Sequence, residues 1–385
     1  MTRKLYYIDS HLMEFEATVT ECRTLKNGCA VILDQTAFFP EGGGQSADTG
    51  YIGDVRVTDV QELGGEILHY CEKPLPVGTV QCCRLDREQR LRRMQNHSGE
   101  HIVSGLAHRL YGCENVGFHM GEREMTVDFD RELSWDELME LEKLANEVVR
   151  SNLFIMTWFP GADELRHLTY RSKLELSEDV RIVEIDGVDR CACCAPHVTR
   201  TGEIGMIKIF DAERHRGGVR ITLACGMDAL DDYRLRQESV TEVSRLLSAK
   251  RDEIAPAVSR MINEQEKAKE RIAMLSAELI SLRATACAET DGNICLFDSL
   301  LDEIAQRELV NLLMPKCKGF AAVFCGNDKD GYRYVIGSRN IDLRKNARAI
   351  NELISGRGGG RPEMISGRAS SRAEDILNAL NTTGF

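Results

Sequence analysis

The spacing of apolar residues changes near residue 90, and this change limits the folds open to the chain. Before it, Phe15, Ala17 and Val19 alternate with polar residues, and turn-forming glycines recur, as at positions 64–65. Alternation of this kind, broken by frequent turns, predicts short antiparallel strands. We therefore expect residues 1–90 to form a small antiparallel β-barrel.

Residues 91–228 have the pattern of an α+β domain. Helical spacing begins at Leu91 and ends at Tyr111-Gly112, and Ser134-Trp-Asp-Glu137 fits a capping box that opens a second helix. Strand-like runs follow at residues 182–185, 204–210 and 219–224. We expect two helices to lie against a sheet in this part of the chain.

Residues 229–288 have the spacing of long helices. From Val240 to Leu282 the apolar positions are separated by three, four or seven residues, which predicts a coiled coil or a long helical hairpin. Pro256 lies inside this pattern and predicts a kink or a break between two helices. The segment is either a spacer or dimer interface, or an ordinary helix pair docked on its own domain.

Residues 289–385 alternate apolar runs with helical stretches, which is typical of a small α/β domain. The whole chain has a net charge of −12, but residues 331–372 carry nine Lys and Arg against three acids. Clustered positive charge attracts phosphate. This end is therefore either a nucleic-acid-binding surface or a solvated charged face.

Composition excludes several classes of protein. No stretch approaches the ~18 consecutive apolar residues of a membrane span. The first residues contain no apolar h-region, so we expect no secretory signal peptide. Fourteen cysteines in 385 residues are too few, and too irregularly spaced, for a small disulfide-stapled protein. We expect a cytoplasmic, multidomain protein with reduced cysteines that are buried thiols or metal ligands.

Four residues in two distant segments have the spacing of metal ligands. His97 and His101 are four residues apart on a predicted helix, so both imidazoles project from one face. Cys193 and His197 have the same separation beside a predicted strand. Three imidazoles and one thiolate form a plausible tetrahedral Zn²⁺ set. Cys191 and Cys194 are alternative thiolate ligands.

Two further motifs allow other readings. The segment from His97 to His101 also has the form H-x-x-E-H, the signature of inverted zinc peptidases, in which Glu100 would be the general base. Three glycines at 42–44 permit positive φ and close backbone approach. They form either a loop against a substrate or another domain, or a tight turn without a ligand. No lysine follows that would make a phosphate-binding loop.

Taken in order, these motifs resemble one family. They are Thr36-x-Phe-Phe-Pro-Glu-Gly-Gly-Gly-Gln45, His97-x-x-x-His101, Cys193-x-x-x-His197 with Thr201-Gly-Glu-Ile-Gly205, Arg220-Ile221, and Arg357-Gly-Gly-Gly-Arg361-Pro362. The first four resemble the editing module of alanyl-tRNA synthetase and the free-standing alanyl-tRNA editing proteins. The last, with the long helices, resembles the C-terminal extension of the synthetase.

The resemblance implies a zinc-dependent aminoacyl-tRNA deacylase without aminoacylation activity. Its substrate would be tRNA for alanine mischarged with serine, or alternatively with glycine. His97, His101, Cys193 and His197 would hold zinc, which would either orient the ester or activate water. Thr36, with Gln45 nearby, would contact the serine hydroxyl, and Arg220 the terminal adenosine.

The resemblance also implies roles for the C-terminal half. The long helices would set how far the C-terminal domain extends along the tRNA, and they would pair two chains into a homodimer. The tRNA body would be bound by the glycine-rich segment, namely by Arg357, Gly358, Gly359, Gly360 and Arg361. Two other functions stay open, an inverted-motif zinc peptidase and a non-catalytic tRNA-binding protein with a structural zinc.

Overall fold

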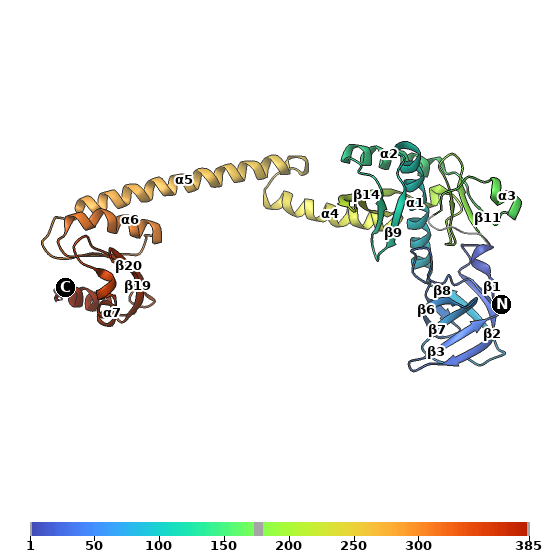
Figure 1. The fold of residues 1–385 in the computed structure, drawn as a ribbon, viewed down its shortest axis with the longest axis horizontal. Helices are drawn as coiled ribbons and strands as arrows, with labels where there is room; N and C mark the ends of the chain where they lie inside the picture. The colour runs from blue at the N-terminus through green and yellow to red at the C-terminus, as the bar shows by residue number, and fades with distance from the viewer. Residues whose placement is uncertain (1, 173–179, 383–385) are drawn as a thin grey trace. The chain divides into compact units, whose positions relative to one another are not determined.

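The computed structural model describes residues 2–172 and 180–382. The chain divides into two compact units, Met1–Glu242 and Val243–Phe385, which are described separately here. Figure 1 labels their helices and strands. Both units mix helices with sheets, which confirms the predicted α+β class. The predicted four-part division is finer than these two units, and its inner boundaries stay predictions.

The first unit begins with the antiparallel barrel expected from the alternation. Six strands close in the order β2-β3-β7-β6-β5-β8. They are β2 (Glu14–Thr24), β3 (Cys29–Leu33), β5 (Gly50–Ile52), β6 (Val55–Leu63), β7 (Glu66–Cys71) and β8 (Val80–Leu85). Phe15, Ala17 and Val19 point into the barrel core, as their alternation predicts. Outside the barrel, β1 (Arg3–Lys4) pairs with β4 (Gln35–Thr36), and a short 3₁₀ turn (Leu5–Tyr7) follows β1.

The rest of this unit places two helices on a sheet. The helices are α1 (Arg87–Tyr111) and α2 (Trp135–Ser151); the sheet has the order β14-β15-β10-β9, and a second sheet has the order β11-β12-β13. The strands are β9 (Asn115–Met120), β10 (Met125–Phe129), β11 (Ile155–Trp158), β12 (Ile182–Ile185), β13 (Asp189–Ala192), β14 (Ile207–His215) and β15 (Gly218–Cys225). The short helix α3 (Ala162–His167) follows β11. The apolar sides of α1, α2 and the four-stranded sheet share one core.

The helix ends follow the sequence signals. Gly112 caps α1 in the left-handed conformation, with φ of 63°. Ser134 and Glu137 form both hydrogen bonds of the predicted capping box on α2. One strand prediction was wrong at its start. Residues 201–204 form a 3₁₀ turn, and β14 begins only at Ile207, because Gly205 turns the chain with φ of 83°.

The predicted long helices are α4 (Gly226–Leu246) and α5 (Ile254–Ala286), separated by a 3₁₀ turn at Arg251–Glu253. The break precedes Pro256, which lies in the first turn of α5. Proline is tolerated there because the amide N–H groups of a first turn have no partner within the helix. A coiled-coil partner for these helices stays a prediction.

The second unit continues with a five-stranded sheet in the order β16-β17-β18-β20-β19. Its strands are β16 (Ile294–Asp298), β17 (Ala321–Asn327), β18 (Gly331–Gly337), β19 (Gly356–Arg361) and β20 (Met364–Ala369). The end of α5 and α6 (Glu303–Leu313) pack in one core, and α7 (Leu343–Leu353) and α8 (Ala373–Thr382) in another. A 3₁₀ turn (Met314–Lys316) follows α6. The apolar runs correctly predicted β16 to β18, whereas β19 and β20 were missed.

All fourteen cysteines are free thiols. Across the described ranges, no helix combines the length and the hydropathy that crossing a membrane requires.

Candidate metal centre and its pocket

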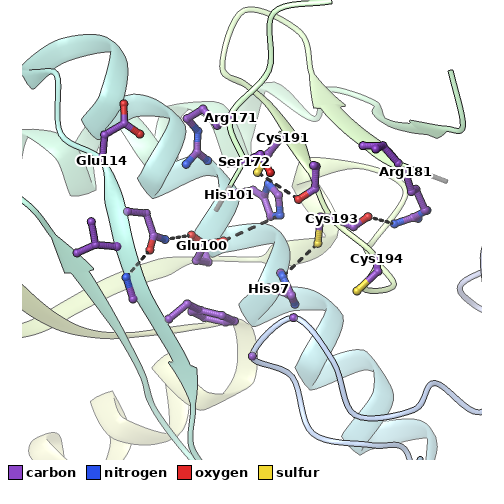
Figure 2. Close-up of a pocket in the computed structure, with 18 of the residues that line it drawn as sticks. His97, Glu100, His101, Glu114, Arg171, Ser172, Arg181, Cys191, Cys193 and Cys194 are labelled. Carbon is purple, nitrogen blue, oxygen red and sulfur yellow. Dashed lines mark hydrogen bonds and ion pairs between the residues drawn. The ribbon is translucent and has the colours of Figure 1, made fainter. Parts of the chain in front are cut away.

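The four residues predicted to bind metal converge in the first unit. His97 and His101 project from α1, and Cys193 and His197 lie in the loop after β13. One ligand atom from each lies within 4.8 Å of the others. The Nε2 atoms of His97 and His197 are each 3.4 Å from the Cys193 sulfur. Figure 2 shows this sulfur directed at the ring of His97.

The Nδ1 atom of each imidazole contacts a polar side chain from a different part of the chain. His97 Nδ1 lies 3.1 Å from Gln45 Oε1, in the loop after the glycines. His101 Nδ1 lies 2.8 Å from Asp189 Oδ2 on β13. His197 Nδ1 lies 3.1 Å from Ser98 Oγ on α1. Fixing Nδ1 in this way directs Nε2 at the cluster and is typical of metal-binding histidines.

Asp189 is itself fixed by Arg171. The guanidinium donates from Nε and Nη2 to the two carboxylate oxygens, at 2.7 and 2.9 Å. Burial alone would raise the pKa of Asp189, but the bonds from His101 and Arg171 outweigh it and lower the pKa to about 2. The carboxylate therefore stays ionised and fixes His101 through its Nδ1 atom, which leaves Nε2 for the cluster.

The electrostatics select one of the three neighbouring cysteines. Burial favours the neutral thiol at Cys193, but His97 and His197 outweigh it, so the pKa of this thiol lies well below its usual value. At Cys191 and Cys194 burial dominates and raises the pKa to about 11 in each case. Cys193 is thus the thiol best suited to be a thiolate ligand.

The donor set fits zinc. Three imidazole nitrogens and one thiolate are ligands that Zn²⁺ accepts in tetrahedral sites. Three of the four residues are almost fully buried, with 2–3% of the surface of each histidine exposed. One ligand atom each of His101, Asp189 and Cys191 also lies within 4.8 Å of the others. Both carboxylate oxygens of Asp189 are already bonded, to His101 Nδ1 and to Arg171. We therefore assign Asp189 to positioning His101 and not to binding the metal.

A cavity of about 620 Å³ opens onto this cluster. Its lining includes Glu100 of α1, Asn115 and Phe118 of β9, and the glycine pair Gly43 and Gly44. Gly44 has φ of 80°, and a Cβ there would lie 2.7 Å from the Phe118 ring. Only glycine allows this close approach. The segment is a tight turn closed by backbone hydrogen bonds between Gly42 and Gln45, and its Gly43 and Gly44 border the cavity; contact with a substrate stays a prediction.

Three predicted catalytic residues, Thr36, Gln45 and Arg220, are not among the residues that line the cavity; Gln45 lies behind His97, against its Nδ1. Thr36 is fully buried in the barrel unit, where its Oγ lies 2.8 Å from His69 Nε2 and accepts from the Phe38 amide at 3.1 Å. Arg220 on β15 forms a two-pronged ion pair with Asp128, at 2.6 and 2.8 Å. The substrate contacts expected of these three residues stay predictions.

The residues predicted to bind tRNA belong to the second unit. Arg357, Gly358, Gly359, Gly360 and Arg361 all lie on β19, the exposed edge strand of the sheet. A groove beside them is lined by Arg344, Arg348 and Arg357 among others. A basic edge strand next to a groove is compatible with phosphate binding.

Several site residues were not found in the sequence. Asp189, Arg171 and Arg181 come from segments without a recognisable motif. Only the fold brings Arg171 and Arg181 to the cavity and Asp189 to His101. Ser98 lies inside the His97–His101 motif, where the helical spacing gives no reason to single it out.

Family comparisons agree with this site. A family model described as "Threonyl and Alanyl tRNA synthetase second additional domain" matches residues 180–222, which include Cys193 and His197. A second, described as "tRNA synthetases class II (A)", matches residues 6–89. The alanine–tRNA ligases of Pyrococcus furiosus and Pyrococcus abyssi are 32% and 30% identical to this chain, over alignments that cover 95% and 98% of it. The chain is a relative of the alanyl-tRNA synthetases. This confirms the resemblance predicted from the motifs.

As a relative of these synthetases, the chain matches only part of them. It spans 42% of the Pyrococcus furiosus ligase and 43% of the Pyrococcus abyssi ligase, less than half of either. Among solved structures, the C-Ala domain of Aquifex aeolicus alanyl-tRNA synthetase matches 25% of this chain at 18% identity, with a TM-score of 0.21. That score is too low to compare the folds.

Proposed function

We propose that this alanyl-tRNA-synthetase relative is a zinc-dependent deacylase that removes serine from mischarged tRNA for alanine, without charging tRNA itself. The convergence of His97, His101, Cys193 and His197 beside a cavity carries the proposal. An inverted-motif peptidase would use the two histidines and a distant carboxylate, and would leave Cys193 and His197 without a role. Glycine is the alternative amino acid.

The reaction is hydrolysis of an ester. Water adds to the ester carbonyl carbon, the bond from this carbon to the ribose oxygen breaks, and the ribose hydroxyl leaves with a proton. Zinc bound by the four side chains would supply a fixed positive charge that orients the ester or polarises its carbonyl. With four protein ligands, orientation is the role that we favour.

Glu100 is suited to position the attacking water. Its Oε1 accepts a hydrogen bond from Ser104 Oγ at 2.6 Å and another from the side-chain amide of Asn115. Its Oε2 lies 4.0 Å from His101 Nε2, and the residue lines the cavity. A carboxylate held in this way can take a proton from a water molecule beside the cluster.

Discrimination between serine and alanine requires a group that bonds the serine hydroxyl. A site built for this hydroxyl rejects alanine because a buried polar group would then stay unpaired. Gln45 fits this description. It is 1% exposed, and its side-chain NH₂ has no acceptor among the described residues. The Thr36 hydroxyl is already bonded to His69, so we favour Gln45 over Thr36 for this contact.

The remaining parts of the proposal concern partners and place. We propose that β19 binds the tRNA body through Arg357 and Arg361, with Gly358 to Gly360 allowing close approach. We also propose that the helical segment 229–288 is a spacer or dimer interface, and that the protein acts in the cytoplasm in translation fidelity.

The direct test is deacylation of seryl-tRNA for alanine, with correctly charged alanyl-tRNA as the control substrate. We expect fast loss of serine, slow loss of alanine, and loss of activity together with bound zinc in Cys193→Ala. Cys113→Ala is the matched control, since this buried cysteine lies in the core and is not one of the four clustered residues. Stable seryl-tRNA in the presence of a zinc-loaded, folded protein would contradict the proposal.

A further inference from the structure

The helix α1 carries two buried arginines before the two histidines of the cluster. Arg90 and Arg93 precede His97 by seven and four residues, and this spacing places all three on one face of the helix. Arg90 is 1% exposed and Arg93 is 8% exposed. In Figure 1, α1 runs from the barrel to the sheet of the same unit. The proposed hydrolysis uses neither arginine, although burying a charge is costly.

Arg90 fixes the base of the loop formed by residues 39–48, which contains the glycine turn. Its Nη2 atom lies 2.7 Å from Asp48 Oδ2, as an ion pair, and donates to the carbonyl oxygen of Ala37. Asp48 is bonded to Phe39 at two points. Its Oδ2 accepts from the Phe39 amide at 2.7 Å, and its own amide donates to the Phe39 carbonyl at 2.9 Å. Asp48 therefore closes the loop, and Arg90 ties this closure to α1.

Arg93 makes a second connection to the same loop. Its Nη1 atom donates to the carbonyl oxygen of Ala47 and lies 3.7 Å from Asp48 Oδ1. Together the two arginines contact the chain on both sides of the loop, at Ala37 before it and at Ala47 and Asp48 at its end.

The tip of this loop brings Gln45 to the metal cluster. Gly42 and Gln45 exchange two backbone hydrogen bonds, each 3.0 Å long. The Gln45 residue is 1% exposed, and its Oε1 lies 3.1 Å from His97 Nδ1. One face of α1 therefore fixes the base of the loop and also supplies the imidazole that the tip contacts. A shift of the base would move Gln45 relative to His97.

Stability alone gives little reason for the pair of Arg90 and Asp48. Their side chains are 1% and 2% exposed, and the cost of removing both charges from water offsets most of their attraction. Apolar replacements of buried ion pairs are often neutral or stabilising. An arginine offers in addition a planar fork of donors with fixed geometry, which here joins Asp48 to Ala37. The pair is better explained by the position that it imposes on the loop.

We propose that Arg90 and Asp48 are positioning residues for Gln45, and that Arg93 supports them. They hold the loop so that Gln45 Oε1 meets His97 Nδ1 and the Gln45 NH₂ stays available for the serine hydroxyl. The second part rests on the proposed function, because it concerns the selection of serine. The first part, the orientation of His97, concerns the metal cluster alone.

The test is a double-mutant cycle of Arg90→Lys and Gln45→Ala, in which the zinc affinity of the full chain is measured by competition with a chelator. Lysine keeps the charge but has no planar fork to join Asp48 to Ala37. We expect each single variant to weaken zinc binding by roughly 10- to 100-fold, as is usual for groups that orient a metal-binding imidazole. In the Gln45→Ala background, Arg90→Lys should have no further effect, because both changes act through one contact.

Arg92→Lys is the matched control. Arg92 lies on the same helix and makes the same kinds of contact, an ion pair with Asp228 at 2.6 Å and a hydrogen bond to the carbonyl oxygen of Gly121 at 2.9 Å. These two partners lie outside residues 37–48. Urea unfolding should show a loss of stability in both lysine variants, whereas zinc affinity should fall only in Arg90→Lys.

A second variant covers the case in which Arg90→Lys does not fold. Arg93→Met then takes its place in the cycle, with Arg92→Met as its control. It removes the bond to the Ala47 carbonyl and leaves Arg90 paired with Asp48. We expect weaker zinc binding in Arg93→Met, and again no further effect in the Gln45→Ala background.

Two results would overturn the positioning role. One is wild-type zinc affinity in the folded arginine variant, which would make the pair a structural contact only. The other is a double variant in which the two losses of zinc affinity simply add.

Deacylation rates test the part that concerns serine. Arg90→Lys should lower the preference for seryl-tRNA over alanyl-tRNA, as Gln45→Ala does, because both disturb the group assigned to the serine hydroxyl. Coupled zinc affinities without any loss of serine from seryl-tRNA would remove the proposed function and keep the positioning of His97. Loss of serine with additive zinc affinities would do the reverse.

Discussion

At the scale of single residues, Asp189 controls the position of His101. The carboxylate accepts from His101 Nδ1 and is clamped by Arg171. We expect Asp189→Asn to weaken zinc binding by roughly 10- to 100-fold, measured by competition with a chelator. Glu184→Gln is the control, because this neighbouring carboxylate pairs with Arg190 and takes no part in the cluster. Equal zinc affinity in both variants would show that Asp189 is merely structural.

A second residue, His69, makes stability depend on pH. Its imidazole is fully buried in the barrel, and burial lowers its pKa to about 4. In the unfolded chain a histidine has a pKa of about 6.5. Between these values the unfolded state binds a proton and the folded state does not, so stability falls as the pH drops from about 6.5 towards 4.

The size of this effect follows from the pKa difference and is on the order of 3 kcal/mol over that range. Urea unfolding of the wild type and His69→Gln at several pH values checks it. The variant should lose less stability on acidification, because a glutamine cannot take the proton. Parallel curves for the two proteins would mean that other groups cause the acid sensitivity.

At the scale of elements, the glycine loop joins the barrel to the cavity. Gly44→Ala would force a positive φ on alanine, at about 1–2 kcal/mol, and would press the new methyl group on Phe118. Phe118 in turn lies against the His97 ring, with centroids 5.1 Å apart. We expect a loss of deacylation on the order of tenfold or more, because a small misplacement at a site is costly.

Gly65→Ala is the control for this loop. Gly65 has φ of 82°, close to that of Gly44, but a Cβ there would meet nothing within 4 Å. Urea unfolding should show the backbone cost in both variants, whereas steady-state deacylation should fall only in Gly44→Ala. If Gly65→Ala loses as much activity as Gly44→Ala, close approach to Phe118 is not the reason for the glycine.

At the scale of the whole molecule, the chain is acidic, with a net charge of −12, but its second unit carries arginines on the edge strand β19. Arg357 and Arg361 are exposed on β19. If each contacts a phosphate, removing both lowers the dependence of log affinity on log salt by about 2. We expect weaker tRNA binding and this smaller slope in Arg357→Ala/Arg361→Ala, measured by filter binding over a salt series.

The matched control for this edge is Arg307→Ala. Arg307 is an exposed arginine of the same unit, on α6, and it pairs with Glu303. Removing this arginine should leave the dependence of log affinity for tRNA on log salt unchanged. An unchanged slope in the double variant would place the tRNA contacts elsewhere on the chain.

The sequence by itself determined the elements whose signal is local. Alternation and turn residues predicted the barrel strands, and the capping residues predicted where α1 ends and α2 begins. The i, i+4 spacing of His97 and His101 depends only on helix geometry, so it was readable before the fold was known. The order of the motifs was enough to predict the family. Local signals suffice where the cause lies within a few residues.

The tertiary structure decided what depends on contacts between distant segments. The strands β19 and β20 were missed because glycine has low strand propensity, yet their pairing is stabilised where Gly358 and Gly367 pack against Tyr334. Arg171 and Arg181 reach the cavity, and Asp189 reaches His101, only through the fold. The Thr36 hydroxyl is bonded to His69, which is more than thirty residues away in the sequence. No spacing rule contains these contacts, because burial and hydrogen bonding between segments arise only when the chain is folded.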